Sequence, residues 1–485
     1  MHSSKRIHFI GIGGVGMSAI AWVLLKKGIP VSGSDLNHTH RTSLLEKNGA
    51  HLFYEHNPSN LRDVGLVVIS SAITEDNPEL AAARRLGLPV LHRSTMLAEI
   101  LEEGQAITVT GTHGKTTTTA MLSLIMEKGG LDPTVLIGGD LADIGGNAKL
   151  GQGPFVLAEA DESDGTFLSY SPQYAILTNI ELDHLDFYSS FKQLREAFRQ
   201  FLENVDSNGY IVLCADDPGV RIVVEEFDRE MKAQGRNRSS GFCFYSLTSS
   251  TADFYAGEIN LLPWGSTFNV YLQGRRLGRL KLPVPGRHNV SNALAALSLG
   301  HILGVEFEAM QHALAGFHGT GRRFQIKGEA RGVMVIDDYA HHPTEVAITI
   351  HGALPLKTTR EGRIITIFQP HRFSRTKALA SEFAAAFDDS DIILVTDVYA
   401  AGEQPIPGVS GKLIFDALNK REHPGALYIP DMEDIPREIS KLILPGDIVF
   451  TMGAGNIWSV GESLLKQLAG VEETKTTVLK GMVNV

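Results

Sequence analysis

The sequence predicts an α/β fold in three domains, and three observations predict it. A strand, a glycine-rich turn and a helix open the chain around Gly11. The same order recurs around Gly111, and the last third repeats short apolar strands that each end in polar residues. Parallel strands that alternate with helices and end in polar loops are typical of Rossmann-like and doubly wound domains.

The length of 485 residues exceeds one ordinary domain, and we place the borders so that the domains cover 1–104, 105–318 and 319–485. Hydrophobic residues make up 43% of the chain and charged residues 20%, which is typical of globular domains with buried cores. The net charge of −11 argues against nucleic acid as a partner, because phosphate backbones bind basic surfaces.

Cysteine usage and hydropathy indicate the compartment. Only Cys214 and Cys243 are present, so the sequence holds no disulfide framework and fits a reducing environment. No stretch is long and apolar enough to span a bilayer, and the N-terminal segment does not resemble a signal peptide. We therefore expect a cytoplasmic protein without a membrane partner.

In the first domain, a strand at 6–10 leads into Gly11-Ile12-Gly13-Gly14-Val15-Gly16 and a helix at 17–27. A second strand at 30–33 delivers Asp35 about 20 positions later, which completes a dinucleotide-type fingerprint. The turn recognises a pyrophosphate beside a ribose, so NAD and a UDP-sugar both fit. Strands are expected at 66–70 and 89–91, and the loop at Ser70 and Ser71 either covers the nucleotide or is an ordinary surface loop.

The central domain opens with an apolar strand at 106–110, a loop from Gly111 to Thr117 and a helix around 120–126. Such a loop presents backbone N–H groups and a helix N-terminus to phosphate oxygens. Lys115 reaches terminal phosphates and the Thr116 hydroxyl suits Mg²⁺. The pattern is G-x-x-G-K-T and lacks the first glycine of the usual motif. It predicts a P-loop ATPase domain, and we expect Lys115, on a turn, to contribute little to the core.

Acidic residues follow the next strand, 154–158, as Glu159 to Asp164. A carboxylate at this place suits Mg²⁺, although an acidic solvated loop is the alternative. The strand at 174–178 precedes His184, which by residue type alone is more often structural than a Mg²⁺ ligand. Helix 191–201 and strand 210–213 follow, and then a β-rich section at 236–282 to which we assign no role.

Two asparagines, Asn289 and Asn292, precede the apolar helix 293–303 and lie three residues apart. Capping of the helix by Asn289 and ligand binding both remain open. A glycine-rich hinge at 316–321 then leads into the third domain. There, strands at 333–336, 363–368, 392–396 and 447–451 each end in a polar loop, which predicts a doubly wound α/β domain with its functional loops at one sheet edge. Pro343, just after the pair His341-His342, is also a plain helix start.

These motifs together resemble the Mur ligases over nearly the whole chain, from His8 to about Trp458. The resemblance rests on several independent segments: Gly11 to Ser18 with Asp35, the loop 111–117, Glu159 to Asp164, His184, His288-Asn289 with Asn292, Gly321 to Phe324, Asp337 to Pro343, and Gln369 to Arg375. The loop without its first glycine is similar to that family's own variant.

The resemblance implies a role for each matching residue. For UDP-sugar binding it implies Gly11, Gly13, Gly14, Gly16, Asp35, Ser70 and Ser71. For ATP it implies Gly111, Thr112, His113, Gly114, Lys115, Thr116, Thr117, Asn289, Asn292, Arg323 and Asp338. For Mg²⁺ it implies Thr116, Glu159 and His184, and for catalysis Lys115, Glu159, His184 and Arg323. For the amino acid it implies Tyr339, His341, His371, Arg372 and Arg375.

The activity implied by the resemblance is ATP-dependent joining of L-alanine to the lactyl carboxylate of UDP-N-acetylmuramate in peptidoglycan biosynthesis. The route is an acyl phosphate, and the products are UDP-N-acetylmuramoyl-L-alanine, ADP and phosphate. A recycling ligase that adds a preformed peptide to the same sugar is the alternative within the family. A nicotinamide oxidoreductase would leave the phosphate loop and Glu159 unused, and a non-catalytic nucleotide-gated module predicts no amine-stimulated ADP release.

Overall fold

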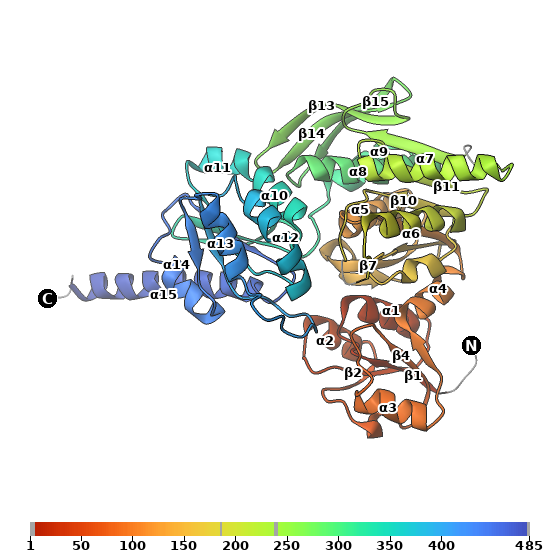
Figure 1. The fold of residues 1–485 in the computed structure, drawn as a ribbon, viewed down its shortest axis with the longest axis horizontal. Helices are drawn as coiled ribbons and strands as arrows, with labels where there is room; N and C mark the ends of the chain where they lie inside the picture. Colours follow the sequence, from red (N-terminus) through yellow and green to blue (C-terminus); the bar gives the residue numbers. More distant parts are fainter. Residues whose placement is uncertain (1–4, 185–186, 237–240, 483–485) are drawn as a thin grey trace. The chain divides into compact units, whose positions relative to one another are not determined.

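The computed structural model describes residues 5–184, 187–236 and 241–482, with side chains described up to residue 470. The chain forms two compact units (Figure 1). Unit 1 comprises Met1–Glu258, Phe268–Lys281 and Val290–Thr320, and unit 2 comprises Ile259–Thr267, Leu282–Asn289 and Gly321–Val485. Helices and strands alternate in both units, which confirms the α/β prediction.

Within the described residues, unit 1 begins with a five-stranded sheet in the order β3-β2-β1-β4-β5, whose pairs are all parallel. Its strands are β1 (Arg6–Ile10), β2 (Val31–Ser34), β3 (His51–Phe53), β4 (Val64–Ile69) and β5 (Val90–His92). The helices between and after them are α1 (Val15–Lys26), α2 (His40–Lys47), α3 (Pro78–Arg85) and α4 (Arg93–Leu101). The middle strands β1 and β2 are almost entirely buried, as expected for a parallel sheet covered on both faces.

A second sheet follows in the order β15-β14-β13-β12-β11-β10-β6-β9-β7-β8, counted over the described residues. From β12 to β7 neighbouring strands run parallel, whereas β7 and β8 form an antiparallel pair. The strands are β6 (Gln105–Thr110), β7 (Thr134–Leu141), β8 (Gly146–Lys149), β9 (Phe155–Glu159), β10 (Tyr174–Leu177), β11 (Tyr210–Cys214), β12 (Phe242–Ser246), β13 (Phe254–Leu262), β14 (Gly265–Leu272) and β15 (Arg275–Leu282).

Among the described residues, the α-helices that accompany this sheet are α5 (Lys115–Lys128), α6 (Phe191–Asn204), α7 (Pro218–Ala233), α8 (Arg287–Ile302) and α9 (Phe307–Ala315). Helices α6 and α7 pack against each other (Figure 1). The buried face of α6 carries Phe198 and Phe201, and the ring of Phe167 lies 5.4 Å and 5.2 Å from theirs. This aromatic cluster anchors the short segment that follows the acidic loop.

Unit 2 contains a third sheet, in the order β16-β17-β21-β18-β19-β20 over the described residues. Only the β16–β17 pair among them is antiparallel. Its strands are β16 (Gln325–Ala330), β17 (Val333–Asp338), β18 (Ile364–Phe368), β19 (Ile392–Val395), β20 (Ala426–Tyr428) and β21 (Ile448–Met452). Its helices are α10 (Pro343–Gly352), α11 (Leu354–Arg360), α12 (Phe373–Ala386), α13 (Lys412–Lys420), α14 (Ile435–Ile439) and α15 (Trp458–Met482).

Two details of the sequence interpretation change. Helix α8 begins at Arg287, so Asn289 lies inside the helix and the N-capping interpretation is wrong; its Nδ2 donates instead to the Pro285 carbonyl at 2.7 Å. Pro343 does start α10, with His342 as its N-cap. The β-rich section is confirmed by β12 to β15, although residues 237–240 within it lie outside the described residues. No described helix is both long and apolar enough to cross a membrane.

Candidate functional site

The loop between β6 and α5 requires glycine at two positions. Gly111 has φ +123° and Gly114 has φ +82°, a region that L side chains rarely adopt. A Cβ on Gly111 would also meet the Thr178 hydroxyl and the backbone of Asn179. The loop therefore passes directly against the end of β10 and then begins α5 at Lys115. A helix N-terminus at this place favours an anionic ligand.

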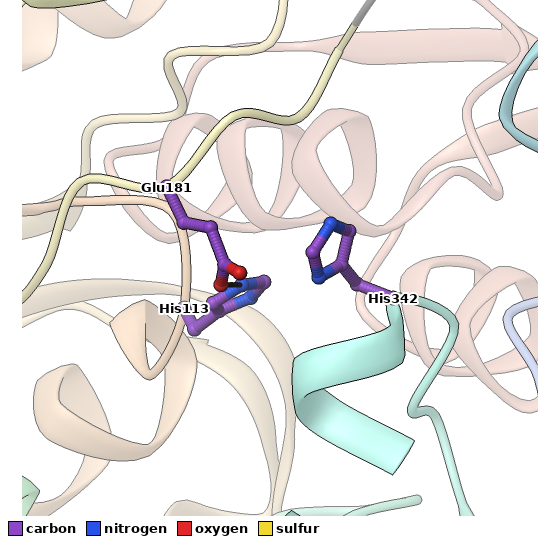
Figure 2. Close-up of side chains that lie close together, drawn as sticks. All are labelled: His113, Glu181 and His342. Atoms are coloured by element: carbon purple, nitrogen blue, oxygen red, sulfur yellow. Dashed lines mark hydrogen bonds and ion pairs between the residues drawn. The ribbon is translucent and has the colours of Figure 1, made fainter. Parts of the chain in front are cut away.

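The residues after β10 brace this loop. The Asn179 side chain accepts from the His113 N–H at 2.8 Å and donates to the His113 carbonyl at 2.9 Å. The Thr178 hydroxyl donates to the same carbonyl at 2.7 Å, and the Thr112 hydroxyl donates to the Glu181 carbonyl at 3.0 Å. Figure 2 shows the side-chain contact between His113 Nε2 and Glu181 Oε2, which is 2.9 Å long. Hydrogen bonds from the residues after β10 thus hold the loop in this conformation.

Lys115 folds back onto its own loop and onto an acid. Its Nζ donates to the Gly111 carbonyl at 2.7 Å, to the Thr112 carbonyl at 3.1 Å and to Glu162 Oε2 at 2.7 Å. Burial alone lowers the pKa of Lys115, but Glu162 and Asp161 raise it above its usual range. The side chain of Glu162 is 1% exposed. Lys115 is only partly buried, in agreement with its predicted place outside the core, but it neutralises a buried carboxylate, so it still contributes to stability.

Next to Lys115, the Thr116 side chain contacts a second acid, Glu159. The Thr116 hydroxyl donates to Glu159 Oε2 at 3.1 Å, and the Gly138 N–H donates to Glu159 Oε1. A Cβ on Gly138 would collide with this carboxylate, so glycine is needed for the close approach. Burial raises the pKa of Glu159 despite these donors and Lys115, which leaves a site where a cation would stabilise the ionised form.

A second group of ligand atoms lies beside it. Oxygen or nitrogen atoms of Asp161, Glu162 and His184 lie within 4.8 Å of one another. Glu162 Oε1 is buried without a hydrogen-bond partner in the described structure and lies 3.4 Å from His184 Nε2. Burial lowers the pKa of His184, but Glu162 and Asp183 raise it above its ordinary value. The two carboxylates, of which Glu162 has one oxygen without a hydrogen-bond donor among the described residues, offer the hard oxygen ligands that Mg²⁺ prefers.

The two predicted asparagines lie on the first turns of α8, and both side chains are buried. A Cβ on Gly114 would meet Asn292 Oδ1 at 2.6 Å, so Asn292 lies directly against the phosphate loop. Helix α8 therefore reaches the place where the loop becomes α5.

The N-terminal glycine turn follows β1, and Gly11 there has φ +78°. The Gly13 N–H donates to Asp35 Oδ2 at 2.9 Å, and the Asn37 N–H donates to Asp35 Oδ1 at 2.9 Å. Both carboxylate oxygens of Asp35 thus already hold backbone groups, and a ribose hydroxyl would share them. Gly14 is the N-cap of α1, and Gly16 lies in its first turn.

Ser70 and Ser71 follow β4. The Ser71 hydroxyl donates to Asp164 Oδ2 at 3.0 Å and lies 3.1 Å from His92 Nε2. Arg93, at the start of α4, lies 3.7 Å from the same Asp164 carboxylate. Within unit 1, this predicted sugar loop therefore contacts the acidic segment that follows β9.

Within unit 2, Arg323 lies just before β16 and Asp338 ends β17, and the antiparallel pairing of these two strands brings them to the same end of the sheet. Asp338 accepts from the Phe324 N–H at 2.7 Å and from the Ala340 N–H at 2.8 Å. Burial raises the pKa of Asp338 to about 6. Arg323 lies 3.4 Å from Glu345, which also accepts from the His341 N–H at 3.0 Å.

The predicted amino-acid residues are mostly brought together. The His341 ring lies 5.3 Å from Tyr339 and 5.6 Å from His371, and Arg375 reaches His371 Nδ1 at 3.4 Å. Arg372 is different: it has φ +71°, and its guanidinium lies 4.0 Å from Glu403.

Sequence reasoning missed several members of these groups: Asp161, Glu162, Asn179, Glu181, Glu345 and Tyr399. Asp161, Glu162 and Asn179 could have been found from the sequence, because the two acids lie in the acidic run and Asn179 directly follows the predicted strand. Tyr399 stacks on His371 at 5.7 Å; it lies in the polar loop predicted after strand 392–396, but nothing in the sequence singled out this residue within the loop.

Comparison with known proteins assigns the class. Residues 6–105 match the Mur ligase family, catalytic domain; residues 109–300 match the Mur ligase middle domain; and residues 322–455 match the Mur ligase, glutamate ligase domain. The chain belongs to the Mur ligase family, a family of ATP-dependent ligases with three domains. The domain borders at 104/105 and 318/319 remain predictions.

Individual relatives show which members of the family the chain is similar to. The chain is 46% identical to the UDP-N-acetylmuramate--L-alanine ligase of Pelotomaculum thermopropionicum, over 96% of this chain and 98% of the relative. The crystal structure of UDP-N-acetylmuramate-alanine ligase from Thermotoga maritima matches with TM-score 0.80 and 32% identity, over 96% and 100% of the two chains. A murein peptide ligase from Psychrobacter arcticus matches with TM-score 0.72 and 25% identity, over 96% and 99%.

Proposed function

We propose that this chain joins L-alanine to the lactyl carboxylate of UDP-N-acetylmuramate, with ATP as the energy source. The observation that carries the proposal is a braced phosphate loop holding Lys115 and Thr116 against two acids, in a chain that matches an L-alanine ligase over nearly its full length. Both described cysteines are free, which fits the reducing cytoplasm that we expect for the reaction.

The chemistry solves one problem: a carboxylate is a poor acylating agent. Transfer of the ATP γ-phosphoryl to the lactyl carboxylate gives an acyl phosphate. The free amine of alanine attacks its carbonyl carbon, and the tetrahedral intermediate expels phosphate, so that ADP, phosphate and the amide are the products. The protein's task is to hold negatively charged reactants together, because positioning and electrostatics dominate phosphoryl transfer.

Lys115 is the residue we assign to the transferring phosphoryl. In the structure its ammonium group rests on Gly111, Thr112 and Glu162, so it is already held at the N-terminus of α5. Exchange of the Glu162 contact for a phosphate oxygen keeps the charge paired throughout. Loss of one such electrostatic contact typically costs about 3–4 kcal/mol of transition-state stabilisation.

The metal ligands we propose for Mg²⁺ are Thr116, Glu159 and His184, with Glu162 as a further carboxylate ligand. The unsatisfied Glu162 oxygen and the raised pKa of Glu159 support a cation in this place. Bound Mg²⁺ would supply charge neutralisation at the phosphates. The chain's own contribution is to orient the carboxylates through Gly138 and to hold the phosphate loop through Asn179.

We also propose which residues bind the UDP-sugar, the amino acid and the nucleotide. We assign the N-terminal glycine turn with Asp35, Ser70 and Ser71 to the UDP-sugar, and the group Tyr339, His341, His371, Arg372 and Arg375 to the amino acid. Asn289, Asn292, Arg323 and Asp338 are assigned to the nucleotide. Support comes from the family membership and from the clustering of these residues within their own units.

The test is phosphate release from ATP in the presence of UDP-N-acetylmuramate and a panel of amines. We expect release with L-alanine, no release when the sugar or the amine is omitted, and no AMP or pyrophosphate. Hydroxylamine should trap the acyl phosphate as a hydroxamate. Release that requires a preformed peptide instead of L-alanine would favour the alternative, a recycling ligase that adds a preformed peptide to the same sugar. The 46% identity to the L-alanine ligase, compared with 25% to the murein peptide ligase of Psychrobacter arcticus, argues against this alternative.

A further inference from the structure

A fully buried carboxylate near the N-terminal glycine turn has no role in the proposed reaction. Glu79, in the first turn of α3, has 0% of its side chain exposed. Glutamate is rarely buried so completely unless it is paired, because removal of its charge from water is costly. A carboxylate in this place therefore needs a compensating set of donors.

The polar groups around Glu79 come from four separate segments. Asn60 Nδ2 donates to Glu79 Oε1 at 2.7 Å, and His8 Nε2 lies 3.4 Å from the same oxygen. Ser34 donates its hydroxyl to Glu79 Oε2, and His56 Nδ1 lies 2.9 Å from that oxygen. Burial alone would raise the pKa of Glu79, but the hydrogen bonds from His8, Ser34 and Asn60 hold it below its ordinary value. Glu79 is thus an ionised hub.

One of these donors also holds the glycine turn. The Ser34 carbonyl accepts from the Gly11 N–H at 2.8 Å and from the Ile12 N–H at 3.0 Å. The next residue, Asp35, accepts from the Gly13 N–H at 2.9 Å. Ser34 therefore connects the two: its hydroxyl donates to Glu79, and its carbonyl accepts from the glycine turn.

We propose that Glu79 is a positioning residue for the UDP-sugar site: through Ser34 it fixes the glycine turn in the conformation that receives the pyrophosphate. This inference rests on the proposed function. Its physical basis is preorganisation, since a turn that is already ordered pays less entropy when its ligand binds. Glu79 itself touches no reactant.

The experiment compares Ser34→Ala with Ser32→Ala. Both serines are buried on β2, two residues apart. Each substitution removes one hydroxyl from the hydrogen-bond network around Glu79. The Ser32 hydroxyl lies 3.0 Å from His8 Nδ1, and its loss leaves the hydrogen bond between Ser34 and Glu79 intact. Glu79→Gln is the third variant, and each protein is assayed for UDP-N-acetylmuramate affinity by calorimetry, ATP affinity, kcat and Tm.

We expect Ser34→Ala to weaken sugar binding roughly tenfold, the effect of one lost hydrogen bond to a charged group. Ser32→Ala should change sugar binding less than about twofold, and Glu79→Gln should weaken it at least as much as Ser34→Ala. ATP affinity should stay unchanged in all three. A fall in Tm with unchanged sugar affinity, or equal losses in the two serine variants, would overturn the positioning role.

The proposed function fails separately from this inference. Wild-type protein that binds NADH and not the UDP-sugar would overturn the substrate assignment, and the same serine comparison made with NADH would still test Glu79. Binding of neither nucleotide would overturn both.

Discussion

At the scale of single residues, the Lys115–Glu162 ion pair bears both on the stability of the fold and on the proposed reaction. Both side chains are largely buried, at 14% and 1% exposure, and their charged atoms lie 2.7 Å apart. Removal of one member of a buried pair leaves an unpaired charge, which costs about 3–5 kcal/mol. Lys115, which we propose to hold the transferring phosphoryl, therefore also contributes to the stability of the fold by pairing a buried charge.

The first prediction is that Lys115→Ala lowers the free energy of unfolding by about 3–5 kcal/mol and abolishes ligation. Lys115→Ala with Glu162→Gln should regain most of that stability, because the buried charge is gone, while ligation stays absent. Urea unfolding and phosphate release measure the two effects. A Lys115→Ala protein with wild-type stability would show that the pair is not formed in solution, and normal ligation would refute the assignment of Lys115.

The second prediction concerns pH. The pKa of Asp338 rises from 3.8 to about 6 on folding, so the folded protein binds more protons than the unfolded chain between these values. Stability from this group is therefore highest near pH 4 and falls as the pH rises through 6, by about 3 kcal/mol. Asp338→Asn lacks this loss. The Tm of the variant minus that of the wild type should increase between pH 4 and pH 7; a constant difference would show that Asp338 titrates normally.

At the scale of elements, helix α5 has a glycine with positive φ at each end. Gly114 precedes the helix with φ +82°, and Gly130 follows it with φ +74°. Alanine at either position would have to adopt the left-handed backbone conformation, which costs about 1 kcal/mol in both cases. Only at Gly114 would the new Cβ also meet a side chain, Asn292 Oδ1, at 2.6 Å, because nothing lies within 4 Å at Gly130.

The third prediction follows from this pair. Gly114→Ala should weaken ATP binding roughly tenfold or more, because overpacking displaces Asn292 and the loop, whereas Gly130→Ala should bind ATP normally. The two variants should lose similar amounts of stability from the backbone term. Calorimetric titration with ATP and thermal unfolding check both points. Equal ATP affinities would mean that Asn292 and the loop do not act together.

The elements also show what sequence patterns can and cannot predict. Strand β1 and the start of α10 were predicted at their observed bounds, because a buried apolar run and a proline at the first helical position are local signals. Strand β7 was not predicted, since Gly138 and Gly139 within it obscure the strand pattern. Glu162 was missed for another reason: its pairing with Lys115 depends on how β6 and β9 align.

At the scale of the whole molecule, the predicted functions are distributed along the chain. The glycine turn at Gly11, the phosphate loop at Gly111 and the cluster around His371 belong to three successive family-matched regions. If each region binds a different reactant, as we propose, the effects of single substitutions on substrate binding should separate by region.

The last prediction tests this separation at Arg375. An arginine matches a carboxylate with two parallel hydrogen bonds, so its loss should raise the KM for L-alanine roughly 10- to 100-fold while ATP and UDP-sugar affinities stay unchanged. Lys377→Ala is the matched control, since Lys377 is an exposed cation on the same helix, whereas Arg375 is 5% exposed. Arg375→Lys keeps the charge without the fork and should show most of the KM increase. Because Arg375 is buried, Tm is measured for each variant, and KM is determined at a temperature where all are folded. If Arg375→Ala loses ATP binding with its alanine KM unchanged, the cluster around His371 serves the nucleotide and the amino-acid pocket lies elsewhere.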